Sequence, residues 1–284
     1  MPAVMFSGAG TLILDIETIP DRELYTPPET APGVERPFPP LYACRPIVIG
    51  VIWLDDALGC RRIGILGEDK SEAAMMSDFA DFMGRVRPLL VTWNGRSFDL
   101  PVLALRALRH GVHFGWYYRG GGYRYRFSEE GHLDLGDVIA DFGAARMTSL
   151  DGAAKLIGLP GKVGVDGSQV EGLFEAGEMG ALRRYCLSDV AQTAFVYLRY
   201  KLVTGDIDLP TYRKVADEFL RALQNDGRFE PLIAACDRER LLLPEGSSRE
   251  ASSREASSSE ASSSDAPASE ASVPESSSPE GSSA

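Results

Sequence analysis

The chain has 284 residues, of which 44% are hydrophobic, so it is long enough to bury a core as one large domain or two small ones. Its 29 basic and 41 acidic residues give a net charge of −12, which argues against tight non-specific binding to duplex DNA, because such binding relies on many Lys and Arg contacts to phosphates. The first residues lack a signal-peptide pattern, and no apolar run approaches the about 20 residues that span a bilayer, so we expect no membrane contact. The four cysteines show no CxxC spacing, and together these features predict a cytoplasmic protein.

The first half of the chain is expected to be mostly strand. Apolar and β-branched runs predict strands at residues 11–17, 47–54, 61–66 and 89–93. The segment 18–45 is rich in Pro and acidic residues, and we expect it to form a long irregular loop. Loops of that length are usually functional or mobile. Ser71 is a candidate N-cap of a helix that runs to about residue 87.

Two acidic residues end the first predicted strand. Asp15 and Glu17 are two positions apart, so both side chains are expected to point to the same face of that strand. Two like charges held side by side repel each other, and burial raises the cost. A bound cation would offset this repulsion, and Mg²⁺ prefers oxygen ligands of this kind. The alternative is a solvated strand end that carries two acids and no ligand.

The second half of the chain is expected to be mostly helical. Pro101 suits the first turn of a helix that runs to about residue 109. A short apolar segment follows at 132–139, and a Gly-rich loop is expected at 159–170. Further helices are predicted at 150–157, 179–202 and 211–223. This order of strands and helices favours a mixed sheet with helices on its faces.

Two more acids and a tyrosine occupy positions typical of a site. Asp99 follows a predicted strand and the Asn94-Gly turn, at the head of a helix. Ligands gather at such strand ends in α/β sheets, although capping of the helix is an alternative role for Asp99. Tyr185 and Asp189 are four residues apart, so they share one helix face. Asp189 lies in an otherwise apolar helix and needs a partner there, unless it faces solvent.

The end of the chain has a different composition from the rest. Residues 244–284 are rich in Ser, Glu and Ala, with a five-residue repeat and almost no large apolar side chain. Such a segment cannot bury enough surface to offset its chain entropy, so we predict a disordered tail after a folded domain at 8–243. The tail is a candidate spacer or a recruitment segment for a protein partner.

Deletion of residues 247–284 is expected to leave the melting temperature of the protein nearly unchanged, because a disordered tail contributes no buried contacts. Thermal unfolding of the full and truncated chains, followed by circular dichroism, measures this. A large drop on truncation would show that the tail packs on the folded domain.

Four acids and a tyrosine fall in the order of the three exonuclease motifs of the DEDD superfamily, in its DEDDy branch. The motifs read Asp-x-Glu from Asp15, Asn-Gly-x-x-Phe-Asp from Asn94 and Tyr-x-x-x-Asp from Tyr185. More closely, the chain is similar over nearly its whole body to the predicted 3′→5′ exonucleases related to the proofreading domain of family-B DNA polymerases. The resemblance implies an α/β, ribonuclease H-like fold with a five-stranded mixed sheet flanked by helices.

Carried over to this chain, the resemblance implies a site for two divalent ions, Mg²⁺ or Mn²⁺. Its expected ligands and catalytic groups are the carboxylates of Asp15, Glu17, Asp99 and Asp189. Paired ions of this kind activate water and stabilise the leaving oxygen of a phosphodiester. Tyr185 is expected to orient the attacking water, because a phenol with an ordinary pKa of about 10 is a poor base at pH 7.

The same motifs supply candidate substrate contacts: Thr18, Asn94 and Phe98. Phe98 is expected either to stack on the terminal base or to pack under the sheet. Lys162 is a candidate phosphate contact, and His132 is expected to be structural.

Residues 116–127 mix aromatic and basic side chains, so they are a candidate strand-binding loop, with an ordinary exposed loop as the alternative. Its candidate contacts are Tyr117, Tyr123, Tyr125, Arg119, Arg124 and Arg126.

The expected function is a metal-dependent 3′→5′ exonuclease that acts at the 3′ ends of single-stranded DNA and releases nucleoside 5′-monophosphates. An exoribonuclease of the same chemistry is one alternative, because recognition of the 2′-OH depends on local shape. A nuclease-like nucleic-acid-binding module without activity is another. The presence of all four acids and Tyr185 speaks against it.

Overall fold

The structure is a computed structural model that describes residues 10–29, 31, 36–119, 122–128, 130–162, 164 and 167–243. The predicted tail at 244–284 lies outside these residues, so its disorder stays a prediction. Part of the predicted Gly-rich loop at 159–170 also lies outside them.

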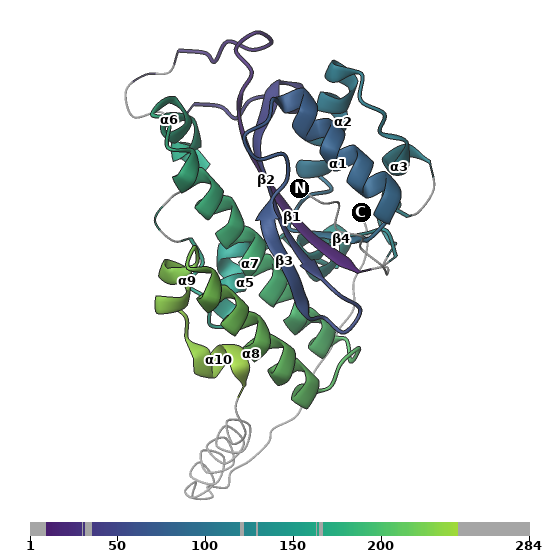
Figure 1. The fold of residues 1–284 in the computed structure, drawn as a ribbon, viewed down its shortest axis with the longest axis vertical. Coiled ribbons are helices and arrows are strands. Elements are labelled where there is room, and N and C mark those ends of the chain that lie inside the picture. The colour runs from purple at the N-terminus through teal and green to yellow at the C-terminus, as the bar shows by residue number, and fades with distance from the viewer. Residues whose placement is uncertain are drawn as a thin grey trace, which may run out of the picture. The chain divides into compact units, whose positions relative to one another are not determined.

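Five strands form one mixed sheet in the order β3-β2-β1-β4-β5 (Figure 1). Strand β2 pairs antiparallel with β1 and β3, while β1 pairs parallel with β4 and β4 parallel with β5. The predicted α/β, ribonuclease H-like fold with its five-stranded mixed sheet is therefore confirmed. The strands are β1 (Thr11–Pro20), β2 (Cys44–Leu54), β3 (Cys60–Ile65), β4 (Leu89–Thr92) and β5 (His132–Asp134).

Helices cover both faces of the sheet, and each face has its own hydrophobic core (Figure 1). Leu12 and Leu14 of β1 pack towards α1 (Glu72–Val86), α2 (Asp99–His110) and α3 (Gly115–Tyr118). Ile13 of β1 faces the opposite core, as the strand period requires. That core includes residues of α4 (Leu135–Ile139), α5 (Leu150–Leu156), α6 (Val170–Glu175), α7 (Met179–Val203), α8 (Leu209–Asp226), α9 (Glu230–Ala234) and α10 (Arg238–Leu242).

Most predicted elements are present, but the predicted loop at 18–45 is too long. Strand β1 runs on to Pro20, which pairs with Cys44 at the start of β2, and a short 3₁₀ helix η1 (Leu41–Ala43) precedes β2. Pairing with a neighbouring strand thus extends β1 past the point where its apolar run stops, and Pro is tolerated at its end. Two further 3₁₀ helices, η2 (Asp141–Gly143) and η3 (Gly167–Gln169), and the short helices α6, α9 and α10 were not predicted.

None of the described helices, the 25-residue α7 included, is both long and apolar enough to cross a bilayer.

Candidate functional site

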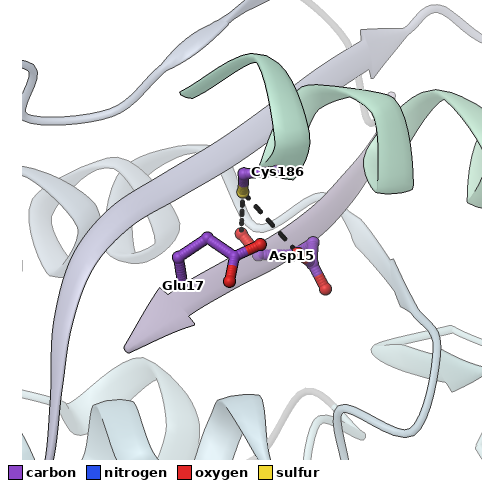
Figure 2. A group of neighbouring side chains, drawn as sticks. All are labelled: Asp15, Glu17 and Cys186. Carbon is purple, nitrogen blue, oxygen red and sulfur yellow. Dashed lines mark hydrogen bonds between the residues drawn. The ribbon is translucent and has the colours of Figure 1, made fainter. Parts of the chain in front are cut away.

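Asp15 and Glu17 lie on the face of β1 that α7 covers (Figure 2). Glu17 is buried, whereas Asp15 keeps some exposed area. Asp15 pairs with Gly50 of β2, and the register between the two strands shifts directly after Glu17. Such bulges occur often beside active sites, because they redirect side chains. The predicted shared orientation of the two acids is therefore present, inside the fold rather than at a solvated strand end.

Helix α7 brings three side chains to these acids. The Cys186 thiol donates to the Asp15 backbone oxygen at 3.4 Å and to Asp15 Oδ2 at 3.6 Å (Figure 2). The neighbouring Tyr185 hydroxyl donates a hydrogen bond to the carboxylate of Asp189, about one turn further along α7, and this is the partner that the acid was expected to need. Tyr185 and Asp189 therefore share one helix face, as their spacing predicts.

Asp99 approaches Asp15 and Glu17 from α2, on the other side of β1. It begins α2, directly after the turn that follows β4, and its side chain is only 3% exposed. Its carboxylate accepts a hydrogen bond from the backbone N–H of Ile16, which lies between Asp15 and Glu17. Asp99 Oδ1 is buried and has no hydrogen-bond partner among the described residues. The hydrogen bond from Ile16 thus ties the start of α2 to the part of β1 that carries the other two acids.

A fifth acid holds the turn before Asp99 in place. Asp134, at the end of β5, accepts hydrogen bonds from the backbone N–H groups of Asn94 at 2.8 Å and Arg96 at 2.9 Å. Asn94 has a φ of 61°, and a Cβ on Gly95 would lie 2.4 Å from Thr92 Oγ1, so the turn needs its Asn-Gly sequence. Sequence reasoning did not give Asp134 a role, because its partners are about 40 residues away along the chain.

The pKa values of all four carboxyl groups are raised, chiefly by burial. Desolvation raises the pKa of Asp15 and of Glu17 well above its ordinary value, and the charges of Asp99 and Asp189 raise both further. Asp15 keeps some exposed surface, but its carboxyl group lies below the protein surface among these acids. Burial also raises the pKa of Asp99 to about 7 and that of Asp189 to about 6. The site by itself therefore disfavours four negative charges at neutral pH.

This set of donors suits hard divalent cations. Ligand atoms of Asp15, Glu17 and Cys186 lie within 4.8 Å of one another. Burial and the neighbouring carboxylates raise the pKa of the Cys186 thiol well above its ordinary value, and a protonated soft sulfur is a poor ligand for Mg²⁺. The carboxylates are thus the donors that fit such an ion, and Asp99 Oδ1 is a buried acceptor that no described residue pairs with.

The three candidate substrate contacts are all half-buried, but they differ in their partners. The Thr18 hydroxyl donates to the sulfur of Cys44, and Thr18 is partly buried. Phe98 directly precedes Asp99 and makes an edge-on contact with Phe38, with ring centroids 5.5 Å apart. Asn94 shapes the turn through its backbone and is partly exposed. Contact of these residues with substrate stays a prediction.

Part of the candidate strand-binding loop is core. Tyr123 is 2% exposed, and its hydroxyl donates to the Pro88 backbone oxygen at 2.7 Å, so the predicted stacking by Tyr123 on a substrate is wrong. Hydrophobic spacing could not distinguish it from its neighbours. Arg126 is held by Asp137, whereas Tyr125 is 63% exposed.

His132 is structural, as expected. The imidazole is fully buried and pairs with Thr92 Oγ1 at 2.8 Å. Burial lowers the pKa of His132 to about 3, so the ring is neutral at physiological pH.

Several solved structures are similar to the chain at low identity. The family B DNA polymerase from the hyperthermophilic archaeon Pyrobaculum calidifontis is 17% identical with a TM-score of 0.48, covering 78% of this chain and 29% of the polymerase. E. coli Exonuclease I in complex with a dT13 oligonucleotide is 12% identical with a TM-score of 0.36, covering 64% of this chain and 43% of that enzyme. The zinc-bound form of the E. coli ExoI–ssDNA complex is 14% identical with a TM-score of 0.37, and the match covers 72% of this chain and 46% of that enzyme. The chain thus spans less than half the length of each.

The chain also matches a protein family over most of its folded part. No curated protein matches it. The family described as "Predicted 3′-5′ exonuclease related to the exonuclease domain of PolB" matches residues 36–234. This range contains Asp99, Tyr185 and Asp189, while Asp15 and Glu17 precede it. Because the match covers more than half of the chain, the protein belongs to the family of predicted 3′–5′ exonucleases related to the exonuclease domain of PolB.

Proposed function

We propose that this protein is a metal-dependent 3′→5′ exonuclease that hydrolyses the terminal phosphodiester bond of single-stranded DNA and releases nucleoside 5′-monophosphates. One observation supports the proposal: the charges of Asp99 on α2 and Asp189 on α7 raise the pKa values of Asp15 and Glu17 on β1, and the buried Asp99 Oδ1 has no hydrogen-bond partner in the described part of the chain. A converging set of acids with raised pKa values is typical of a functional site.

Asp15, Glu17, Asp99 and Asp189 would hold two divalent ions, Mg²⁺ or Mn²⁺. Bound there, such ions lower the pKa of water and offset charge on the reacting phosphate. The four carboxylates and two divalent cations together would be neutral, which removes the repulsion that four bare acids exert on an anionic phosphodiester. Divalent cations are therefore expected to raise both the affinity for substrate and the stability of the protein.

Lys162 supports a phosphate site beside Asp189. Its charge lowers the pKa of Asp189, so the ammonium group lies close to the candidate metal ligands. The Lys162 backbone N–H donates to Asp151 Oδ1 at 2.9 Å, which ties this part of the loop to α5. A positive charge near the carboxylates suits a polynucleotide phosphate.

Replacement of Tyr185 by Phe is expected to slow cleavage by about 10- to 100-fold, because the phenol would hold the attacking water and fix Asp189 through its hydrogen bond. Burial and three neighbouring carboxylates raise the pKa of Tyr185, so the hydroxyl stays protonated and does not act as a base at neutral pH. Single-turnover cleavage measures the rate, and calorimetric titration with Mn²⁺ measures metal binding. The rate is expected to fall while metal affinity persists, and unchanged turnover would remove the proposed role of Tyr185.

The proposed activity is tested by digestion of end-labelled single-stranded DNA, duplex DNA and RNA side by side with Mg²⁺ or Mn²⁺. We expect single nucleotides to be released from the 3′ end of single-stranded DNA, and none in the presence of a chelator. Digestion of RNA faster than DNA would contradict the proposed DNA substrate and support the exoribonuclease alternative. No digestion of any substrate would support a binding module. A cytoplasmic location and a protein partner of the tail at 244–284 also stay proposals.

A further inference from the structure

An exposed phenylalanine stands at the edge of the candidate site. Phe38 is 68% exposed, although a phenyl ring gains most from burial. Its ring makes an edge-on contact with the ring of Phe98 at a centroid distance of 5.5 Å and an interplanar angle of 68°, and Phe98 directly precedes Asp99. Edge-on packing of this kind is a favourable aromatic geometry that leaves much of the Phe38 ring in solvent.

The segment that carries Phe38 is fixed to β1 close to the acids. The Cys44 thiol donates to the backbone oxygens of Pro39 at 3.7 Å and Pro40 at 3.6 Å. The sulfur of Cys44 in turn accepts from the Thr18 hydroxyl, one residue after Glu17. Two prolines directly after Phe38 restrict its backbone further. The backbone that follows Phe38 is therefore tied to β1 through Cys44 and Thr18, and the ring itself contacts Phe98.

We propose that Phe38 is a substrate-binding residue that stacks on the unpaired nucleobase of the terminal nucleotide. The inference rests on the proposed exonuclease function. A base is the partner that fits, because a polynucleotide end bound at the four carboxylates places a planar aromatic group beside its phosphate. Stacking on one exposed ring does not distinguish between bases, so Phe38 favours single-stranded ends without selecting a sequence.

The test compares two 5′-fluorescein oligodeoxynucleotides that differ only at the 3′-terminal nucleotide, which carries a base in one and is abasic in the other. Fluorescence anisotropy in Ca²⁺, a cation that takes the same oxygen ligands, gives the dissociation constant. Phe38→Ala is expected to weaken binding of the normal end by about tenfold, with little effect on the abasic end. Phe38→Trp is expected to restore binding. With Mg²⁺, Phe38→Ala is expected to raise KM while kcat changes less than about twofold.

The control is Tyr42→Ala, which removes another exposed aromatic ring from the same segment and is expected to leave binding unchanged. Equal binding by wild type and Phe38→Ala, or the same loss on the abasic end, would overturn the stacking role. If the wild-type protein digests no oligonucleotide with Mg²⁺, the proposed function fails, but the anisotropy comparison still decides whether Phe38 contacts a terminal base.

Discussion

Replacement of Asp15 by Asn together with Glu17 by Gln is expected to reduce 3′→5′ digestion of single-stranded DNA by at least about 1,000-fold. The amides keep the size of the side chains but remove two of the four negative charges that would hold the ions. Metal ions contribute several kcal/mol of transition-state stabilisation in such sites, and each 1.36 kcal/mol is about tenfold in rate. Release of labelled nucleotides with Mg²⁺ measures the loss.

A matched control is Asp56→Asn, which removes an exposed carboxylate from the turn between β2 and β3 and is expected to leave the rate unchanged. Calorimetric titration with Mn²⁺ is expected to lose its signal in the double variant. Digestion at more than about a tenth of the wild-type rate would show that these two acids do not hold the catalytic ions.

The same double variant is expected to be more stable than the wild type in the absence of metal. The pKa of each of the four acids is raised in the folded state, so the folded state binds more protons than the unfolded state. The free energy of unfolding therefore falls as pH rises from about 4, the ordinary value for these groups, through about 6 for Asp189 and about 7 for Asp99.

Urea unfolding in EDTA at several pH values between 4 and 8 measures this dependence. The wild type is expected to lose stability as the pH rises from 4 to 8, and the double variant is expected to lose less. Addition of Mg²⁺ is expected to restore the stability of the wild type at pH 7. Parallel curves for the two proteins would show that Asp15 and Glu17 do not share a repulsive site.

Local periodicity was sufficient to predict the parts of the site that lie within one element. The strand period alone puts Asp15 and Glu17 on one face, and the helix period puts Tyr185 beside Asp189. The Asn-Gly pair at 94 predicted the turn before Asp99, where the left-handed backbone of Asn94 is found. The motif order was needed to predict that these elements meet, because periodicity does not determine contacts between distant segments.

Contacts between distant segments explain what the sequence did not predict. Asp134 and Asn94 are brought together only when β5 pairs with β4. In the sequence, Tyr123 cannot be distinguished from the other aromatic residues of an Arg-rich stretch. In the structure it packs against Trp116 and donates a hydrogen bond to the Pro88 backbone oxygen. The extent of β1 depends in the same way on its pairing with β2. The close approach between the sheet and α7 is a further contact between distant segments that the sequence did not predict.

Replacement of Gly50 by Val is expected to lower the digestion rate by about 100-fold, although Gly50 contributes no side chain to the site. Gly50 lies opposite Asp15 in the β1–β2 ladder. A Cβ there would stand 2.7 Å from Cys186 Sγ and 3.1 Å from Val190 Cγ2, so the sheet can approach α7 this closely only with Gly. A bulkier residue would push away the helix that carries Tyr185 and Asp189, and a displacement of about 1 Å costs about 100-fold in rate.

Gly64→Val is a matched control, because Gly64 lies in the neighbouring strand β3 and a Cβ there meets nothing within 4 Å. It is expected to leave both rate and stability near wild type, whereas Gly50→Val is expected to cost about 1–3 kcal/mol of unfolding free energy through overpacking. Urea unfolding with Mg²⁺ and single-turnover cleavage measure the two effects. A Gly50→Val protein that cleaves within twofold of the wild-type rate would mean that the site tolerates a displaced α7, and the acids on β1 would then need another partner than Asp189.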